Sequence, residues 1–217
     1  MGAYKRKKHR RLNPRFALLC LALVLGAAAV GLWWANRGLP GEDIAVPDYV
    51  ERDYIPVNDW SRPGTPLEDI NAVVIHYVGN PGTTAKANRN YFASLASGKE
   101  GTYASSHFVV GLEGEVIQCI PLTEIAYASN TRNGDTVSIE VCHPDETGAF
   151  SPVTYDRAVE LTAWLCREFK LDAEQDVIRH YDVTGKECPR YYVEHPEAWD
   201  TFRSDVAAEM ERQEKES

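Results

Sequence analysis

The hydrophobic and polar positions divide the chain into segments of different character. Residues 16–35 form one uncharged apolar run, and residues 36–66 carry five prolines with little periodicity. In residues 67–210, short apolar runs alternate with stretches in which apolar residues recur every three or four positions. Short apolar runs are typical of strands, and apolar residues that recur every three or four positions are typical of amphipathic helices. Residues 67–210 therefore predict one ordinary domain. A polar tail, residues 211–217, follows it.

The first half of the predicted domain contains a strand, a helix and a hairpin. Residues 72–78 form a nearly continuous apolar run, as expected of a strand buried on both faces. Residues 83–95 predict a helix, with Thr84 as its N-cap. Residues 106–111 and 115–120 then predict two adjacent antiparallel strands joined by a short turn.

The second half repeats the alternation of strands and helices. Residues 136–142 alternate apolar and polar, which predicts a strand with one core face and one polar face. A helix is expected after Thr154 as N-cap, a strand at residues 176–180, and a last helix from about Pro196. The expected fold is therefore α/β, with a central mixed β-sheet flanked by helices.

The N-terminal segment predicts a transmembrane helix. Residues 1–15 contain seven Lys and Arg and no acidic residue, and the apolar run over residues 16–35 is near the ~20 residues that cross a bilayer. The basic segment is expected in the cytoplasm and the domain outside, held off the membrane by residues 36–66 as an extended spacer that becomes a wrapping arm. Two alternatives are a cleaved signal peptide, because small alanines lie in the run, and a lipid on Cys20.

The remaining charge is strongly acidic. The chain has 23 Lys and Arg against 32 Asp and Glu, and with seven basic residues in the first 15, the rest has 16 against 32. Such a surface repels nucleic acid, which is therefore an unexpected partner. The ordinary explanation of this negative charge is that it keeps the domain soluble. Separately, the domain is expected to be monomeric.

The cysteines do not suggest a disulfide framework. There are five in 217 residues, and Cys119, Cys142 and Cys166 lie in strand-like or helix-like runs. These three are expected as buried thiols, with one pairing left open.

Two histidines and a cysteine are candidate metal ligands. His76 and His180 each lie at or near the end of a predicted strand, where sites in α/β sheets tend to form. Cys188 follows His180 by eight residues. Two imidazoles and one thiolate would supply three ligands to a tetrahedral zinc ion and leave its fourth position open, as in catalytic sites. The sequence therefore predicts metal-assisted hydrolysis.

Five motifs resemble those of one enzyme family. They occur in order, at spacings similar to those of the type 2 zinc-dependent N-acetylmuramoyl-L-alanine amidases, the superfamily that also contains peptidoglycan recognition proteins. The resemblance extends from about Arg62 to Trp199 and leaves the membrane segment and the spacer unexplained. The motifs are Arg62–Gly64, Val74–Gly79, Ser105–Gly111, Ser138–Glu140 and His180–Pro189.

The resemblance implies a role for each of five residues. The zinc ligands of the family fall on His76, His180 and Cys188, its general base on Glu140, and the lysine before the third ligand on Lys186. It also implies Zn²⁺ as the cofactor and peptidoglycan as the partner, cleaved at the amide between N-acetylmuramic acid and L-alanine.

The chemistry of amide hydrolysis requires groups of this kind. A carboxylate takes the proton of the attacking water and returns it to the leaving amine, and Glu140 is expected on the polar face of its strand. Lys186 could place positive charge beside the developing oxyanion. The alternative is that Glu140 and Lys186 form an ion pair at the sheet end.

The sequence departs from the family pattern in two places, both expected to affect substrate contacts more than zinc. Ser106 stands where some members have Tyr, with Tyr103 close in sequence, and Ala126-Tyr127-Ala128 stands where many members read Ala-Trp-His. His107 and His143 are not expected as ligands, because three ligands are already assigned.

The sequence thus predicts a membrane-anchored extracytoplasmic amidase, or a secreted one if the N-terminal segment is cleaved. A peptidoglycan-binding receptor without catalysis and a zinc peptidase of the stem peptide remain as alternatives. Because Cys188 is present, the metal site is expected to be complete, which favours the enzyme over the receptor.

Overall fold

The computed structural model describes residues 20, 22–26 and 38–216, which belong to two units divided at Gly38. The expected membrane anchor, residues 16–35, lies largely outside the described residues. Within the part that is described, no helix is both long and apolar enough to span a bilayer. The second unit, from Leu39 onward, carries the sheet and the candidate site.

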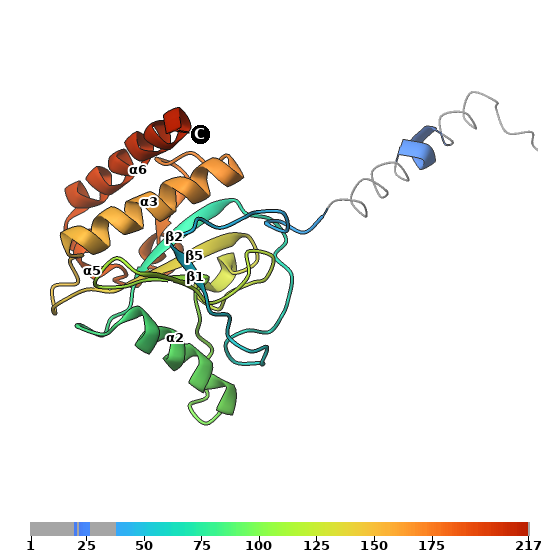
Figure 1. Cartoon of the computed structure of the whole chain (residues 1–217). Helices are drawn as coiled ribbons and strands as arrows, with labels where there is room; N and C mark the ends of the chain where they lie inside the picture. Colours follow the sequence, from blue (N-terminus) through green and yellow to red (C-terminus); the bar gives the residue numbers. More distant parts are fainter. Residues whose placement is uncertain (1–19, 21, 27–37, 217) are drawn as a thin grey trace, which may run out of the picture. The chain divides into compact units, whose positions relative to one another are not determined.

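Six strands form one mixed sheet within residues 39–216, in the order β1-β4-β3-β5-β2-β6. Only β3 and β4 pair antiparallel, as the predicted hairpin, and the other neighbours run parallel. The expectation of a central mixed sheet flanked by helices is confirmed (Figure 1). The strands are β1 (Val50–Arg52), β2 (Ala72–Tyr77), β3 (Phe108–Val110), β4 (Val116–Gln118), β5 (Thr136–Val141) and β6 (Val177–Arg179).

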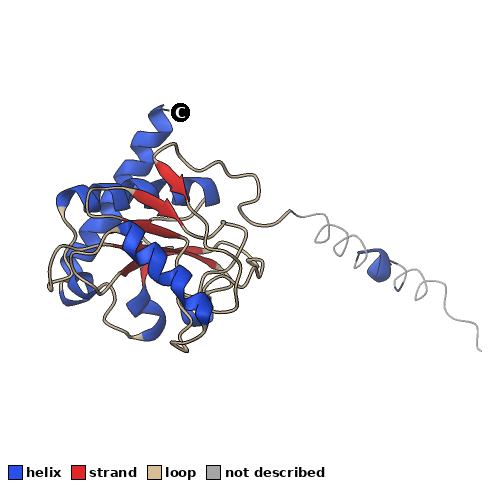
Figure 2. Ribbon diagram, turned by 60° about the horizontal axis from the view of Figure 1, so that its bottom comes forward, coloured by secondary structure: helices blue, strands red, loops and turns tan. Residues whose placement is uncertain are grey.

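Helices cover both faces of the sheet (Figures 1 and 2). The long helices α3 (Pro152–Phe169) and α6 (Pro196–Glu216) pack together on one face, and α2 (Ala85–Ser94) lies on the other. Short helical turns complete the unit. These are η1 (Leu95–Ser97), η2 (Asn130–Arg132), α4 (His180–Thr184) and α5 (Arg190–Glu194).

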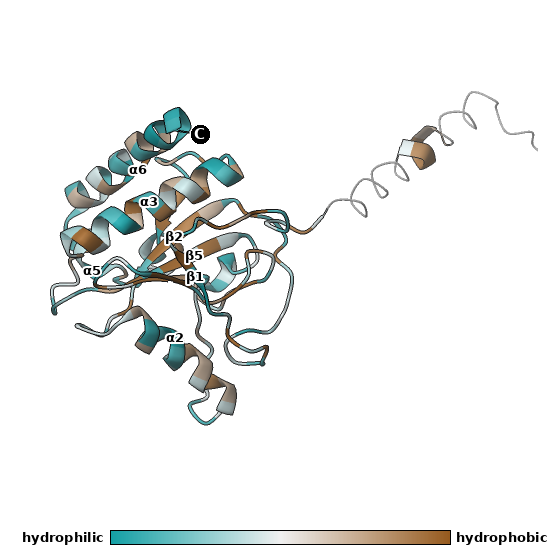
Figure 3. Ribbon diagram, viewed as in Figure 1, coloured by the Kyte–Doolittle hydropathy of each residue, from teal (hydrophilic) through white to brown (hydrophobic). Residues whose placement is uncertain are grey.

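Apolar residues on the two faces of the strands build two separate cores. The larger core joins alternate residues of β2, β3 and β5 to Leu161 and Leu165 of α3 and Phe202 of α6. The smaller core joins the intervening residues, such as Val109 and Cys142, to α2. The strands are accordingly the most hydrophobic parts of the unit, and α6 is largely hydrophilic (Figure 3).

The second core completes the expectation for residues 136–142. Val137, Ile139 and Val141 face the larger core and the opposite face is polar, as predicted, but that polar face is also largely buried. Alternation of polar and apolar residues normally marks a face open to water. Here the polar face of β5 is covered by α2 and by loops; the hydroxyl of Ser138 accepts from the backbone N–H of His107, whereas one carboxyl oxygen of Glu140 has no partner.

The helix boundaries follow from their capping residues. Thr84 caps α2 as predicted, with its side chain accepting a hydrogen bond from Ala87 N. Thr154 does not cap α3: Ser151 does, and Pro152 occupies the first turn, where its missing N–H costs nothing. The hydroxyl of Thr154 instead donates to the carbonyl of Gly111 at 3.1 Å.

Two expected boundaries also shift at the ends of the domain. Residues 211–217, expected as a polar tail, continue α6 as far as Glu216. Ion pairs one turn apart support this charged segment, including Arg212 with Glu209 and Glu216.

The expected spacer, residues 36–66, is part of the folded unit from Leu39 onward. It supplies the edge strand β1, and the side chain of Ile55 is fully buried in the smaller core. Arg62 forms a two-pronged ion pair with Glu124, with contacts of 2.7 and 2.8 Å, and donates to the carbonyl of Ile55. These contacts hold the segment against the sheet as an arm, which we call the N-terminal arm (residues 39–66).

A buried histidine links the sheet to the loop after β4. His107 Nδ1 accepts from the backbone N–H of Ser138, and its Nε2 donates to the carbonyl of Glu124 at 2.9 Å. Both ring nitrogens are therefore satisfied in the neutral form. Burial lowers the pKa of His107 to about 4, because the charged ring would lose its water, and the carbonyl and charge of Glu124 oppose this shift only in part.

The first prediction concerns the acid stability of this linkage. Between pH 6.5 and 4 the unfolded chain binds a proton at this histidine that the folded chain excludes, so stability falls as the pH drops. Denaturant unfolding should show that wild type loses up to about 2 kcal/mol more than His107→Gln between pH 7 and pH 5. Parallel pH dependences in the two proteins would contradict this role of His107.

Candidate metal centre and active-site cleft

The strand order brings three polar residues together where the strands end, which we call the carboxyl edge of the sheet. β2 lies between β5 and β6 and runs parallel to both, so the carboxyl ends of the three strands meet. His76 of β2 is directly opposite Glu140 of β5. His180 follows β6 immediately, as the first residue of α4. This edge is the usual location of sites in α/β sheets.

The three predicted metal ligands lie together at this edge. The donor atoms of His76, His180 and Cys188 all lie within 4.8 Å of one another, and all three residues are buried. The Sγ atom of Cys188 is 3.8 Å from Nδ1 of His76, and the two imidazole centroids are 4.6 Å apart.

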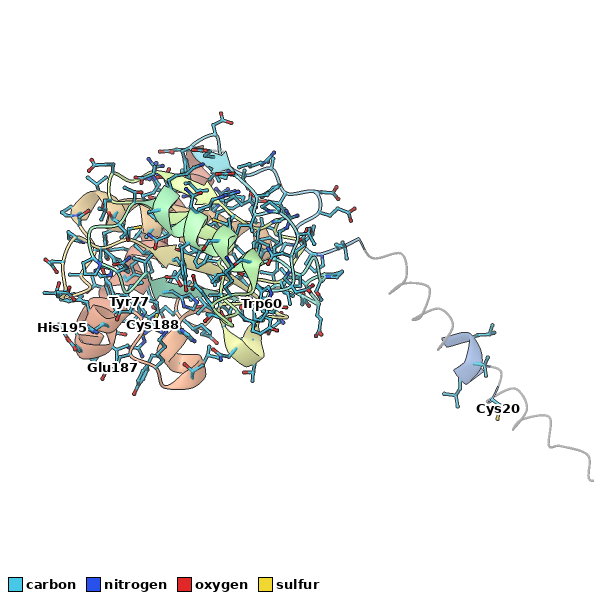
Figure 4. All side chains as sticks on the ribbon, turned by 90° about the horizontal axis from the view of Figure 1, so that it is seen from below. Cys20, Trp60, Tyr77, Glu187, Cys188 and His195 are labelled. Atoms are coloured by element: carbon cyan, nitrogen blue, oxygen red, sulfur yellow. The ribbon has the colours of Figure 1, made fainter. Side chains whose placement is uncertain are left out.

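A tight turn after β6 brings Cys188 to the two histidines. Gly185 ends α4 with a φ of 76°, a conformation that favours glycine, and so reverses the chain. The backbone N–H of Tyr181 then donates to the carbonyl of Cys188 at 2.9 Å. The backbone of Tyr77 also donates to the Cys188 thiol, and Figure 4 shows the two residues next to each other.

Two nitrogens of the cluster are buried without hydrogen-bond partners: Nδ1 of His180 and Nε2 of His76. An unpaired buried polar atom costs roughly 1–3 kcal/mol. Burial, followed by the charges of His180 and Lys186, lowers the pKa of His76 well below its usual value. Burial likewise raises the pKa of the Cys188 thiol to about 12. A divalent cation would compensate the cost at Nδ1 of His180 and would favour the thiolate of Cys188, while His76 has Nδ1 on the side of the Cys188 sulfur. Two nitrogens with one sulfur are a donor set that suits zinc.

Glu140 is buried beside the cluster with an unsatisfied carboxyl oxygen. Its Oε2 has no hydrogen-bond partner. Burial raises the pKa of the Glu140 carboxyl to about 8, and the positive charge of Lys186 opposes that rise. Lys186 therefore acts on Glu140 through its charge, with no hydrogen bond to Oε2. This geometry does not favour the alternative of a structural ion pair at the sheet end.

The cluster opens into a cleft of about 650 Å³. The cluster residues, Glu140 and Lys186 line one part of it, and Tyr103, Tyr127 and Asn130 line another. The ring of Trp60, from the N-terminal arm, stacks on Tyr103 with centroids 4.7 Å apart, and Tyr127 meets Tyr103 edge to face. Tyr103 remains 57% exposed, so an aromatic surface borders the cleft without belonging to the core.

His107 and His143 do not belong to the cluster, as expected. His107 is hydrogen-bonded to Ser138 and Glu124, and His143 donates from Nδ1 to the carbonyl of Asp145 at 2.7 Å. Expected as a loop residue, His143 follows β5 but is almost fully buried, and its ring lies against Tyr77.

Ser106 and the remaining cysteines also lie outside the cleft lining. Ser106 is completely buried, and its hydroxyl lies 2.9 Å from the carbonyl of Ser138. Ser106 therefore stabilises the sheet and does not line the cleft. Cys119, Cys142 and Cys166 are buried free thiols, so the pairing that the sequence left open does not form.

Two residues near the cleft, Asn130 and Trp60, could not be identified from the sequence, and Tyr127 was identified only as part of a motif that departs from the family pattern. Asn130 accepts a hydrogen bond from His180, and Trp60 and Tyr127 complete the aromatic border with Tyr103. Trp60 lies in a segment that the prolines marked as a spacer, so its sequence offered no signal. Tyr127 precedes Ala128, one of the two departures noted in the sequence, which is the one available hint.

Fold and site together define an α/β domain with a buried three-donor cluster at the carboxyl edge of a mixed sheet. The chain belongs to the N-acetylmuramoyl-L-alanine amidase family, whose profile matches residues 66–191. This confirms the family that the motifs predicted.

Individual relatives agree with this membership. The chain is 33% identical over 177 residues to the N-acetylmuramoyl-L-alanine amidase BlyA of Bacillus subtilis (strain 168), and 31% identical over 169 residues to the amidase CwlL of Bacillus licheniformis. Each match covers 72% of this chain but 46% of the relative, so the chain spans about half of their length.

Solved structures carry the same fold. The catalytic domain of XlyA is 26% identical, with a TM-score of 0.59, over 72% of this chain and 98% of that domain. PlyL, at 21% identity, aligns with a TM-score of 0.61 over 72% of this chain and 96% of its own, which shows the fold.

The second prediction concerns the protonation of Glu140. In metal-free protein, carbon NMR of the labelled carboxyl should show Glu140 titrating near pH 8, far above an exposed glutamate. Lys186→Met should move this pKa higher, because the lysine charge favours the ionised form. A midpoint near 4.5, or no effect of Lys186→Met, would contradict the assigned environment.

Proposed function

We propose that this chain hydrolyses the amide between N-acetylmuramic acid and L-alanine of peptidoglycan, with zinc held by His76, His180 and Cys188. The observation that carries this proposal is the convergence of three buried donors and a buried carboxyl at the end of an open cleft. Family membership and relatives named as amidases support the choice of substrate.

The groups around the cluster would divide the chemistry. Zinc, when bound, polarises the scissile carbonyl and lowers the pKa of water to about 7. Glu140 would accept the proton that water gives up as its oxygen bonds to the carbonyl carbon. Glu140 then delivers that proton to the amide nitrogen as the C–N bond breaks. Burial raises the pKa of this carboxyl to about 8 in the metal-free site, and the positive charge of a bound zinc would lower it toward the ionised form that accepts the proton.

Lys186 would stabilise the negative charge that develops on the carbonyl oxygen. Its charge already acts on Glu140, His76 and His180, which places it beside all the reacting groups. Lys186 is an exposed residue, so it would act from the open side of the cleft, where the carbonyl oxygen would lie.

The aromatic border supports a saccharide at the mouth of the cleft. The substrate joins a sugar to a peptide, and a flat ring with an exposed face offers an apolar surface to the C–H face of a sugar. Tyr103 has such a face, because Trp60 supports the ring from the arm and Tyr127 holds its edge.

The proposal for location rests on the sequence of the N-terminal segment. The basic residues 1–15 followed by the apolar run 16–35 are typical of an anchor with its following domain outside the cell. An anchored domain would lie beside the cell wall, where the substrate is. Secretion after cleavage of the segment would lead to the same compartment.

The third prediction tests the reaction. With zinc present, the protein should release new L-alanine amino termini from peptidoglycan, and mass spectrometry should find intact stem peptides freed from lactyl groups. Glu140→Gln should lower kcat by about 10² to 10⁴, because it cannot accept the proton.

Other product patterns would overturn this proposal in distinguishable ways. Fragments cut within the stem peptide would indicate a peptidase. Tight glycopeptide binding without cleavage, by a protein free of metal, would indicate a receptor. Zinc close to one per chain that is lost in Cys188→Ser would support the enzyme, since removing the thiolate leaves only two ligands.

The fourth prediction concerns the aromatic border. Tyr103→Ala should raise KM about two- to tenfold, from the roughly 0.5–1.5 kcal/mol of a ring contact, and leave kcat nearly unchanged. Tyr103→Phe keeps the ring and should behave as wild type. Because Tyr103 is largely exposed, neither change should unfold the protein. If Tyr103→Ala instead lowered kcat two- to tenfold and left KM unchanged, a binding role for this ring would be excluded.

A further inference from the structure

One ring nitrogen of His180 has a partner outside the metal cluster. Its Nε2 lies 3.0 Å from Oδ1 of Asn130, a residue of η2 that is 50 positions earlier in the chain. The other nitrogen, Nδ1, is buried without a hydrogen-bond partner and is the donor available to the cluster. The two nitrogens of this ring are therefore used for different purposes.

The partner decides which nitrogen carries the proton. A neutral imidazole has one N–H and one lone pair, and a metal needs the lone pair. The amide oxygen of Asn130 can only accept, so it holds the proton on Nε2 and leaves the lone pair on Nδ1. With the proton on Nδ1 instead, a buried N–H would point into the cluster without an acceptor, at a cost of roughly 1–3 kcal/mol.

His180 depends on such a contact more than His76 does. His76 lies within β2, paired with Glu140 of β5, and directly follows Ile75, which is also paired with β6. His180 begins a five-residue helix after the edge strand β6, so fewer contacts limit its ring. A hydrogen bond to the free nitrogen is then an effective way to fix the orientation of the ring.

The loop that carries Asn130 is held by other residues. Asn133 Oδ1 accepts hydrogen bonds from the backbone N–H groups of Ala128 and Ser129, and Thr136 donates to the carbonyl of Arg132. Asn130 itself has a φ of 52°, a left-handed conformation that Asn, Asp and Gly tolerate. Its side chain can therefore be changed without removing the bonds that shape the loop.

We infer that Asn130 is a positioning residue, which orients His180 and fixes its tautomer so that Nδ1 binds the metal. This inference rests on the proposed zinc site. A neutral amide gives this orientation without adding negative charge to the site, whereas a carboxylate in the same place would also make the imidazole more basic. Removing the acceptor at position 130 should therefore weaken zinc binding, and replacing the amide by a carboxylate should not.

The test compares zinc affinity in three variants of the full-length protein, by competition with a chromogenic chelator. Asn130→Gly keeps the left-handed backbone and removes the acceptor, so zinc should dissociate about 10- to 100-fold more readily. Asn130→Asp keeps an oxygen acceptor and should bind zinc at least as tightly as wild type. Thr131→Gly, an exposed neighbour in the same turn, controls for loop flexibility and should change nothing.

A spectroscopic measurement separates orientation from general loosening of the loop. In metal-free protein with labelled histidine, nitrogen NMR should show the proton of His180 on Nε2 in wild type and in Asn130→Asp. Asn130→Gly should lose this preference while its unfolding transition stays close to that of Thr131→Gly.

Each result has a distinct meaning. If wild type binds zinc and Asn130→Gly binds equally well, the role of Asn130 is overturned and the zinc site remains. Equal losses in Asn130→Asp and Asn130→Gly would also overturn it, because an acceptor would then make no difference. If wild type binds no zinc at all, the proposed function fails together with the site.

Discussion

Parallel pairing of β2 with both β5 and β6 determines where every candidate catalytic group lies. Because all three strands end at one edge, His76, Glu140 and His180 meet there although they are far apart in the chain. A shift of one residue in the register of β2 would turn His76 to the opposite face, among the leucines of α3. The larger core, which fixes this register, is therefore also what keeps the metal ligands together.

The same burial that builds the fold gives the site its chemical state. Removing water from Cys188 and Glu140 raises the pKa of both groups, to about 12 and about 8. Elsewhere in the domain, the buried ring of His107 has partners at both nitrogens. At the edge, atoms of His76, His180 and Glu140 have none. Because His143 also has one unpaired ring nitrogen, Nε2, an unpaired buried atom indicates a candidate ligand only where other donors lie beside it, as they do in the cluster.

The sequence predicted the features that depend on local patterns or on single strand ends. The hairpin, the cap of α2 and the residues of the cluster all belong to this class. It could not identify the contacts that join distant segments. The prolines predicted a spacer that becomes a wrapping arm, but they did not predict that Ile55 and Arg62 would find partners far along the chain. Asn130 could not be identified either, because its function depends on a ring 50 residues away.

The central claim is that two imidazoles and one thiolate from this edge hold a zinc ion with a position left for water. X-ray absorption on the zinc-loaded protein measures this directly. The expected spectrum has two nitrogen neighbours at about 2.0–2.1 Å, one sulfur at about 2.3 Å and one further light atom. Cys188→Ser should remove the sulfur contribution. A spectrum without sulfur in the wild type, or with four protein ligands and no open position, would contradict the claim.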